Sequence, residues 1–403
     1  MKKFFIWIII ICTIFTFAYA FSASYNSQNI DRLDYVIAIG IDKAPNDNNL
    51  QVSFEFTDLG AFSESGSSEG SEPIIDTVIA PSIPEAVNLM NAYAGKQVNL
   101  SHCKVVIFSE DVAKDGILEE VTYLMNAPQI RPTTNIIIAT EKAKDYIENS
   151  TSSLEGILTK YYDIFPTSAE YTGYTSNILL SRFYQNLTSD ESGAVAILGT
   201  KSKSSNENSQ NDNLLESVSS GETIVEGDRG TENIGLAVFN KDQYIGSLSA
   251  IETLCYTLIE EEVDNFSVCI DNPIDANKKI DISVSSLEPT HTKVDISKDN
   301  PVITIKFNLT AKALTGQDSL DFSDKDTLNT ALKDYLTSKM KDFLYKTSRD
   351  YGCDINGFYR LVKQQFLTIP EYENYNWEEK YRNADFNVEI DSNVISSFLV
   401  QNS

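Results

Sequence analysis

The chain has 403 residues and a formal net charge of −26, with 58 Asp and Glu residues against 32 Lys and Arg. This length is too great for one ordinary hydrophobic core, so it predicts two or three domains. A phosphate backbone or an anionic lipid surface repels so acidic a chain overall, which argues against nucleic acid as a partner.

The first 23 residues have the pattern of a targeting segment. Two lysines precede an uncharged apolar run, residues 4–21, which ends near an Ala-Tyr-Ala sequence typical of signal-peptide cleavage. The run is also almost long enough to cross a bilayer, for which about 20 residues are needed. A cleaved signal peptide and a retained anchor both remain open, and either one exports the rest of the chain. The residues that would form the anchor are Lys2, Lys3, Phe4, Trp7 and Phe17.

The first half of the exported chain predicts a mixed sheet covered by helices. Short β-branched and aromatic runs predict strands at residues 34–42, 50–56, 74–80, 105–108, 134–140 and 194–198. Apolar residues at helical spacing predict helices at residues 82–94, 115–126 and 142–149, and residues 152–187 are helix-prone. Ser109 and Gly116 are a possible helix cap and stop after the strand at 105–108. We expect a mixed α/β N-terminal domain at residues 24–199, which could comprise two subdomains.

Residues 200–230 change character, because Ser, Asn, Glu and Gly dominate and large apolar residues are few. This composition predicts a flexible acidic linker or loop. A similar stretch at residues 60–72 predicts a second flexible loop.

The second half, residues 231–398, predicts an antiparallel sheet packed against a long helix, so the whole chain is α+β. The expected strands are a hairpin at 235–240 and 243–249, then 266–270, 280–287, 293–296, 302–311 and 384–390. The expected helices are 251–260, 324–348 and 357–366, and the long one places its apolar residues on one stripe.

Cysteine and histidine usage argues against a metal site. The four cysteines after the leader are widely scattered, there is no C-x-x-C, and only two histidines occur. One disulfide, such as Cys255–Cys269, is an alternative. The wide spacing of the cysteines favours free buried thiols at Cys103, Cys255, Cys269 and Cys353. We expect no metal and no cofactor.

Several polar residues invite a functional interpretation, and each has a more common structural one. His102, near two acids, could be a base or ligand, but a histidine that supports a strand end is more common. Asp42 could bind a cation, but an Asp that caps a turn is more common. The acidic run at 321–326 lacks the Gly and terminal Glu of a calcium loop, so it reads as a helix start.

Five tyrosines could form a sugar or partner surface, although packing is their more common role. They are Tyr161, Tyr162, Tyr171, Tyr174 and Tyr184. No nucleophile motif such as G-x-S-x-G accompanies His102, so we expect no catalytic residue and no enzymatic activity.

Four segments carry a resemblance to a known family. They read A-I-G-I-D-K at 38–43, L-S-H-C-K-V-V-I at 100–107, G-L-A-V-F at 235–239, and D-I-N-G-F at 354–358. In this order they resemble the C subunit of spore germinant receptors, the Ger(x)C family, over about residues 30–390. The motif positions carried over are Gly40, Asp42, His102, Lys104, Gly235, Glu252 and Gly357.

The resemblance implies a non-enzymatic, extracytoplasmic, membrane-associated C subunit that assembles with A and B receptor subunits in spore germination. It implies a place on the outer face of the cell membrane or the spore inner membrane. Ser24 stands where the family has its lipidated cysteine, so thioether lipidation is impossible there and we expect the uncleaved leader to anchor the chain. The alternative is a solute-binding component of an uptake system, with a small-molecule ligand unknown in either case. A third class, a cell-wall hydrolase, lacks a catalytic constellation.

Overall fold

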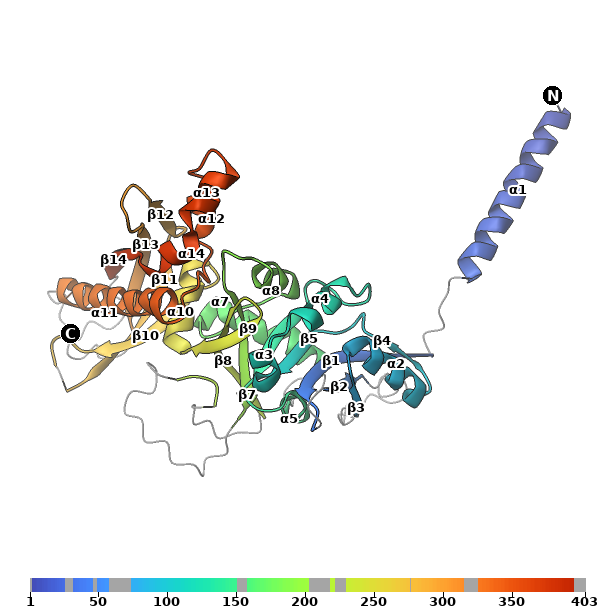
Figure 1. Ribbon diagram of the computed structural model, residues 1–403, viewed down its shortest axis with the longest axis horizontal. Coiled ribbons are helices and arrows are strands. Elements are labelled where there is room, and N and C mark those ends of the chain that lie inside the picture. The colour runs from blue at the N-terminus through green and yellow to red at the C-terminus, as the bar shows by residue number, and fades with distance from the viewer. Residues whose placement is uncertain are drawn as a thin grey trace, which may run out of the picture.

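The computed structural model describes residues 2–25, 32–45, 49–57, 74–150, 158–202, 218–221, 230–275, 277–314 and 325–394. They form an N-terminal helix and two lobes, each built around one sheet (Figure 1). We call the lobe with the first sheet the N-terminal lobe and the lobe with the second sheet the C-terminal lobe. The predicted loop at 60–72, most of the predicted linker at 200–230 and the acids at 321–324 lie outside the described residues.

The leader is helix α1 (Lys2–Tyr25), a helix of 24 residues. Its side chains are described for residues 4–17, and all of these are exposed, including Phe4, Trp7 and Phe17. No helix in the described part of the chain is both long enough and apolar enough to cross a membrane.

The N-terminal lobe is built on a sheet with the strand order β3-β2-β1-β5-β6-β7-β8-β9, and β4 pairs with the start of β1. The strands are β1 (Leu33–Lys43), β2 (Leu50–Phe56), β3 (Ile74–Ala80), β4 (Gln97–Asn99), β5 (Val105–Ser109), β6 (Asn135–Ala139), β7 (Ala194–Lys201), β8 (Thr231–Asn240) and β9 (Gln243–Leu248). The central strands β1, β5, β6 and β7 are parallel to one another. They are almost entirely apolar because helices cover both of their faces.

Helix α5 packs on one face of this sheet, and α3, α4 and α8 pack on the other (Figure 1). The helices of the lobe are α2 (Ile83–Ala94), α3 (Glu110–Asp115), α4 (Leu118–Asn126), α5 (Ala143–Asn149), α6 (Leu158–Ile164), the 3-10 turn η3 (Phe165–Ser168), α7 (Ala169–Thr172) and α8 (Leu180–Leu187). The predicted mixed sheet covered by helices is therefore confirmed. Ser109 does precede α3, but its side chain makes no capping hydrogen bond.

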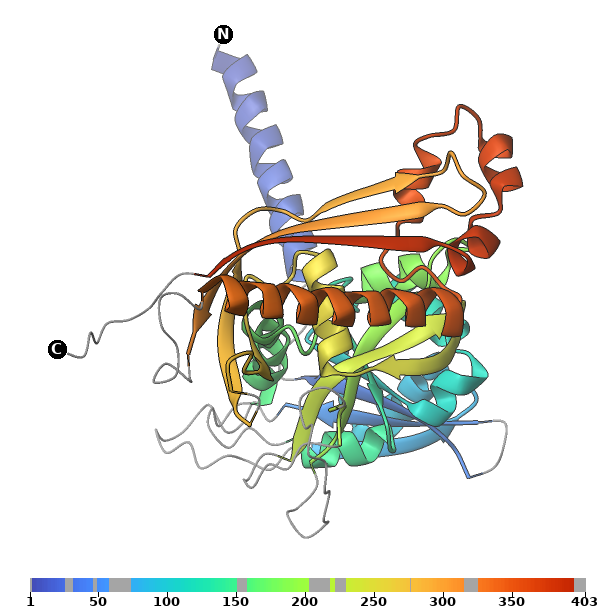
Figure 2. The same cartoon turned by 90° about the vertical axis from the view of Figure 1, so that its left-hand side faces the viewer.

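The C-terminal lobe has a second sheet beside a long helix, α11. Its strands are β10 (Asn265–Asp271), β11 (Lys279–Ser286), β12 (His291–Asp295), β13 (Val302–Ala313) and β14 (Asp385–Val394). Its helices are α10 (Ala250–Ile259), α11 (Lys325–Tyr345), the π-helical turn η6 (Lys346–Asp350), α12 (Tyr359–Lys363), α13 (Ile369–Tyr375) and α14 (Trp377–Arg382). Helix α11 runs alongside β14 (Figure 2) and buries Leu328, Leu332, Leu336, Met340, Phe343 and Leu344.

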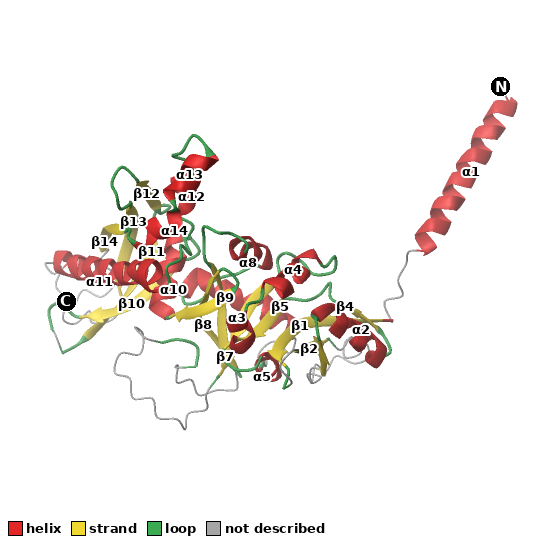
Figure 3. Cartoon of the chain, in the orientation of Figure 1, coloured by secondary structure: helices red, strands yellow, loops and turns green. Residues whose placement is uncertain are grey.

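Three features differ from the expectation (Figure 3). The hairpin β8–β9 joins the first sheet, because the buried segment of β8 pairs with β7. Strand β14 is parallel to β13, since the chain returns to it through a helical crossover, and such crossovers produce parallel neighbours. The predicted helix 357–366 ends early at Lys363, and a new helix starts after Thr368, whose capping box and Pro370 favour a fresh start.

Gly235 provides a test of this arrangement. It has a φ of 94°, and a Cβ there would lie 2.3 Å from the carbonyl oxygen of Leu248 on β9. Gly95 also has a positive φ, 71°, but a Cβ there meets nothing within 4 Å. We expect Gly235→Ala to lower the free energy of unfolding by about 2–5 kcal/mol, from backbone strain plus overpacking, and Gly95→Ala by about 1–2 kcal/mol from strain alone. Urea titration of both variants measures this, and equal losses would contradict the close β8–β9 contact.

Candidate functional site: the junction of the two lobes

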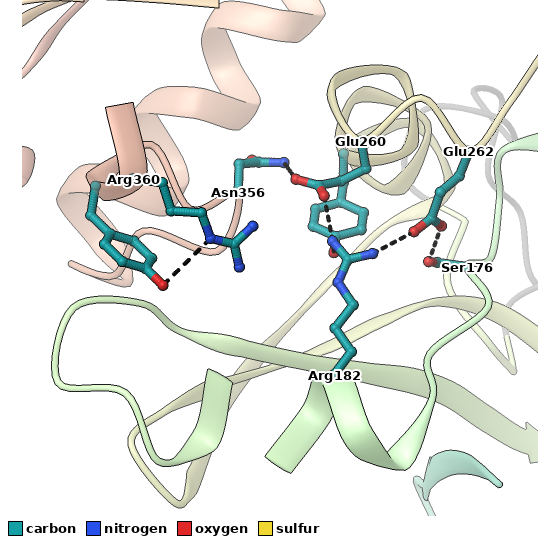
Figure 4. A network of polar contacts seen from close by, with 8 residues as sticks. Ser176, Arg182, Glu260, Glu262, Asn356 and Arg360 are labelled. Carbon is teal, nitrogen blue, oxygen red and sulfur yellow. Dashed lines mark hydrogen bonds and ion pairs between the residues drawn. The ribbon is translucent and has the colours of Figure 1, made fainter. Parts of the chain in front are cut away.

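A cluster of charged side chains joins the two lobes (Figure 4). The guanidinium of Arg182, on α8 of the N-terminal lobe, forms ion pairs with Glu260 and Glu262, which follow α10. The distance from Arg182 Nη1 to Glu262 Oε1 is 2.9 Å, and Arg182 Nη2 also donates to the Tyr256 hydroxyl at 3.2 Å. We call Arg182, Glu260 and Glu262 the interlobe ion cluster.

The interlobe ion cluster is completed by neutral donors from both lobes. Ser176, in the N-terminal lobe, donates its hydroxyl to Glu262, and Asn356, in the C-terminal lobe, donates its amide to Glu260 at 3.0 Å (Figure 4). Burial raises the pKa of the Glu262 carboxyl, and the Ser176 hydrogen bond and the Arg182 charge partly offset this. Because only 13% of the Glu260 side chain and 18% of the Glu262 side chain are exposed, each needs its cationic partner.

Further hydrogen bonds cross the junction on both sides of the cluster. The amide of Gly193 donates to the carbonyl of Asp354 at 3.1 Å, and the amide of Asp264 donates to the carbonyl of Glu170 at 3.2 Å. Lys363 on α12 lies 3.4 Å from a carboxylate oxygen of Glu191. The two lobes are therefore joined by backbone as well as side-chain contacts.

The motif at 354–358 forms a buried corner of the C-terminal lobe. One carboxylate oxygen of Asp354 accepts the backbone amide of Tyr359 at 2.8 Å and the indole N–H of Trp377 at 3.1 Å. Burial raises the pKa of Asp354 to about 6, although these donors favour the charged form. Gly357 has a φ of 71°, which glycine adopts without strain. Asp354 and Gly357 thus shape the turn into α12 and attach it to α14.

The motif at 38–43 joins β1 to α5. A Cβ on Gly40 would lie 2.8 Å from the Ile147 side chain, so glycine allows α5 to approach the sheet. The carboxylate of Asp42 accepts the backbone amides of Ala143 at 2.7 Å and Lys144 at 3.0 Å, the first residues of α5. Burial raises the pKa of Asp42 despite these bonds. Its role here is that of a cap supplied by a neighbouring strand.

Glu252 has two structural roles. With Ser249 it forms the capping box of α10, and both its carboxylate oxygens lie 2.8 Å from the Lys346 ammonium. Lys346 and Tyr351 also donate to the carbonyl of Ser247 on β9, at 3.2 and 2.7 Å. The end of α11 is in this way attached to the last strand of the first sheet.

His102 and Lys104 lie at the other end of the N-terminal lobe. The exposed His102 ring meets the Tyr35 ring edge-on, with 4.7 Å between centroids. The Lys104 ammonium lies 2.9 Å from a carboxylate oxygen of Asp163. Neither residue is brought to the interlobe ion cluster, and their functional role stays a prediction.

The five tyrosines differ in exposure and contacts, with Tyr184 half-buried, and a shared sugar or partner surface stays a prediction. Tyr162 is buried, Tyr161 stacks on Phe165, Tyr174 donates to a β10 carbonyl, and Tyr171 is 62% exposed. Cys103, Cys255, Cys269 and Cys353 are free thiols, and three of them are buried. Among the described residues, no three His, Cys, Asp or Glu side chains gather as a metal site.

Glu55 is a buried carboxyl in β2. One of its oxygens accepts the Tyr162 hydroxyl at 3.1 Å, and the other has no hydrogen-bond partner among the described residues. Burial raises the pKa of Glu55 to about 8, and the Tyr162 bond lowers it only in part. The raised pKa favours the protonated form of Glu55 over its charged form at neutral pH.

Sequence reasoning did not single out the interlobe ion cluster or Glu55. Arg182 lies in a helix-prone stretch, and residues 260–262 form an acidic run that a solvated helix end would also show. Their pairing depends on contacts across 78 and 80 positions, which no spacing rule reveals. For Glu55 a signal existed, because it is the single charged residue in a strand of mainly apolar residues.

One exposed apolar feature stands out on the C-terminal lobe. Leu367, between α12 and α13, is 95% exposed, and Ile369, the first residue of α13, is 65% exposed. These helices project from the body of the lobe (Figure 1). A partner protein would be able to bury both side chains at once.

Comparisons with known proteins cover nearly the whole chain. The family model of the spore germination protein N-terminal domain matches residues 26–224, and that of the spore germination B3/GerAC-like C-terminal domain matches residues 234–397. A curated relative from Bacillus subtilis (strain 168), named as the spore germination protein YfkR, is 25% identical over 228 residues. This match covers 54% of the present chain and spans about half, 52%, of the relative. The crystal structure of the GerBC protein has the same fold, with a TM-score of 0.54 at 13% identity, covering 89% of this chain and 96% of that one.

The interlobe ion cluster predicts a large effect of one substitution. Arg182→Met keeps an unbranched apolar stem but removes the guanidinium, so two largely buried carboxylates lose their cation. We expect it to lower the free energy of unfolding by about 3–5 kcal/mol in chemical denaturation. The control is Arg382→Met, which removes an exposed pair with Glu378 and should cost less than about 1 kcal/mol. Equal losses in the two variants would contradict a structural role for the cluster.

Glu55 predicts a pH dependence of stability. Its pKa in the folded state, about 8, lies above its ordinary value of 4.5, so its contribution is fully present below pH 4.5 and is lost as the pH rises through about 8. Glu55→Gln mimics the protonated form, so we expect it to remove on the order of 1–3 kcal/mol of the stability loss between pH 5 and pH 9. Urea titrations at both pH values measure this. The exposed Glu119→Gln is the control, and an unchanged pH slope in Glu55→Gln would refute the assignment.

Proposed function

The chain belongs to the GerAC-like family of spore germination proteins, and from this premise we propose that it is a non-enzymatic, extracytoplasmic C subunit of a germinant receptor. In this role it assembles with an A and a B subunit. The observation that supports the proposal most directly is that the two family models together span residues 26–397 with a gap of nine residues. The GerBC protein supports the fold alone.

The placement of the motif residues fits a subunit that acts through binding. Gly40, Asp42, Gly235, Glu252 and Gly357 each hold a turn, a helix start or a close approach of two elements. Motif residues of this kind maintain a shape that partners recognise. The exposed Leu367 and Ile369 then supply a candidate contact for a partner subunit.

Attachment to the membrane is assigned to α1 in this proposal. Ser24 has no thiol, so a thioether-linked lipid cannot form at this position. Helix α1 presents Phe4, Trp7 and Phe17 outward, and Lys2 and Lys3 precede its apolar run. Lysines on the cytoplasmic side would orient α1 so that both lobes face outward, at the cell membrane or the spore inner membrane.

The alternative function, a solute-binding component of an uptake system, requires a ligand cleft between the lobes. At this junction the lobes meet in the interlobe ion cluster, whose side chains contact one another directly. A pocket lined by residues of both lobes, among them Glu191 and Asp354, lies at the same junction, so the preference for the receptor subunit rests on the family match.

The proposal predicts two companions in a pull-down. The tagged chain, purified from detergent-solubilised membranes, should carry two membrane-embedded subunits and retain its leader, as mass spectrometry of the partners and of its own N-terminus would show. Leu367→Glu with Ile369→Glu should lower recovery of the companions about tenfold or more, because two charges would enter an apolar contact. Leu287→Glu, at a residue 63% exposed elsewhere on the C-terminal lobe, is the control and should leave recovery unchanged.

Two results would contradict the proposal separately. Recovery of the chain with no companions would remove the receptor role. A mature N-terminus at Phe21 would remove the anchoring role of α1 and leave the family assignment intact.

A further inference from the structure

One end of the N-terminal lobe gathers exposed apolar and basic side chains where the chain enters β1. The start of β1 pairs with β4, and the Lys96 ammonium lies 3.0 Å from a carboxylate oxygen of Asp34. The C-terminal end of α2 lies beside β4, because the Asn91 side chain accepts the Val98 amide at 2.8 Å. The exposed residues gathered here, which we call the tether-side face, are Arg32, Leu89, Tyr93, Lys96 and His102.

The apolar part of the tether-side face lies on α2. Tyr93 is 76% exposed and Leu89 is 42% exposed. They are four positions apart, so they share one side of the helix. They border the buried stripe of α2, which consists of Ile83, Ala86 and Met90, and the side opposite that stripe carries Glu85, Asn88 and Ala92.

The charge of this face differs from that of the whole chain. No Asp or Glu occurs from Ala86 to Ser109, although 58 acids in 403 residues would place about three in such a stretch. The same stretch contains Lys96, His102 and Lys104. Asp34 and Asp163 pair with Lys96 and Lys104, so this end of the molecule is less acidic than the chain as a whole without being strongly basic.

The length of the connection to α1 limits where this face can lie. Helix α1 ends at Tyr25 and β1 starts at Leu33. Eight steps of fully extended chain span at most about 27 Å. If α1 holds the chain at a membrane, the start of β1 and the residues around it stay within that distance of the end of α1.

We propose that the tether-side face rests on the bilayer surface, with Tyr93 and Leu89 at the level of the headgroups and Arg32 and Lys96 against anionic lipid phosphates. Aromatic and basic residues are the side chains that this interface favours. The inference rests on the proposed anchoring by α1 and adds to it a fixed orientation, which leaves the C-terminal lobe directed away from this contact.

Site-specific fluorescence on the full chain in vesicles tests the orientation. Cys12→Ser and Cys269→Ser remove the two cysteines that are not buried. Ala92→Cys, exposed next to Tyr93, then carries an environment-sensitive label, and Thr330→Cys, exposed on α11, carries it in the control. In vesicles of phosphatidylcholine and phosphatidylglycerol we expect blue-shifted emission and quenching by nitroxide-labelled lipid at position 92, and neither at position 330.

A second pair of variants tests the contact of the basic residues with anionic lipid. Arg32→Gln with Lys96→Gln should lower the equilibrium constant for the contact about thirtyfold, since each basic residue near an anionic surface contributes about 1 kcal/mol. Lys293→Gln with Lys298→Gln, two exposed lysines of the C-terminal lobe, is the matched control.

The possible results distinguish the proposed orientation of the tether-side face from the proposed anchoring by α1. Chains that float with the vesicles but show no quenching at position 92, or equal quenching at both positions, would overturn the orientation and leave the anchor intact. Quenching at position 92 that is unchanged by the Arg32 and Lys96 substitutions would overturn the contact with anionic lipid. Chains that do not float with the vesicles would remove both the anchor and the orientation.

Discussion

The arrangement of the two lobes depends on one guanidinium, that of Arg182, which faces two largely buried carboxylates across the junction. Glu260 and Glu262 lie just after α10, so their positions are fixed by the same helix that connects the first sheet to the second. Because unpaired carboxylates at such positions are costly, the cluster favours one relative placement of the lobes over others. The bonds of Lys346 and Tyr351 to β9, a strand of the first sheet, also favour this placement.

A fixed shape explains what the motif residues have in common. Asp42 starts α5, Glu252 starts α10 and binds Lys346, and Asp354 fastens the turn into α12 to α14. The carboxylates of Asp42 and Asp354 thus accept backbone amides, and the carboxylate of Glu252 binds the Lys346 ammonium. Under the proposed function, in which the chain presents surfaces to a membrane and to partner subunits, a shape held at these points is the main requirement.

The sequence allowed much of the fold and little of the junction to be predicted. Periodicity located the buried strands β5 and β6 and the stripe of α11, because apolar burial is a local signal. It could not show that β8–β9 belongs to the first sheet or that β14 is parallel, since strand pairing is a long-range choice. The motifs directed attention to Asp42 and Glu252, whereas Arg182 carries no local signal and is defined only by its distant partners.

Scanning calorimetry of the full chain in detergent tests the central claim, that the two lobes form one unit. We predict a single cooperative transition in which the calorimetric and van't Hoff enthalpies agree. Two separate transitions in the unmodified chain would show that the lobes unfold independently. That result would contradict the claim that the interlobe ion cluster and the bonds of Lys346 and Tyr351 to β9 hold the lobes together.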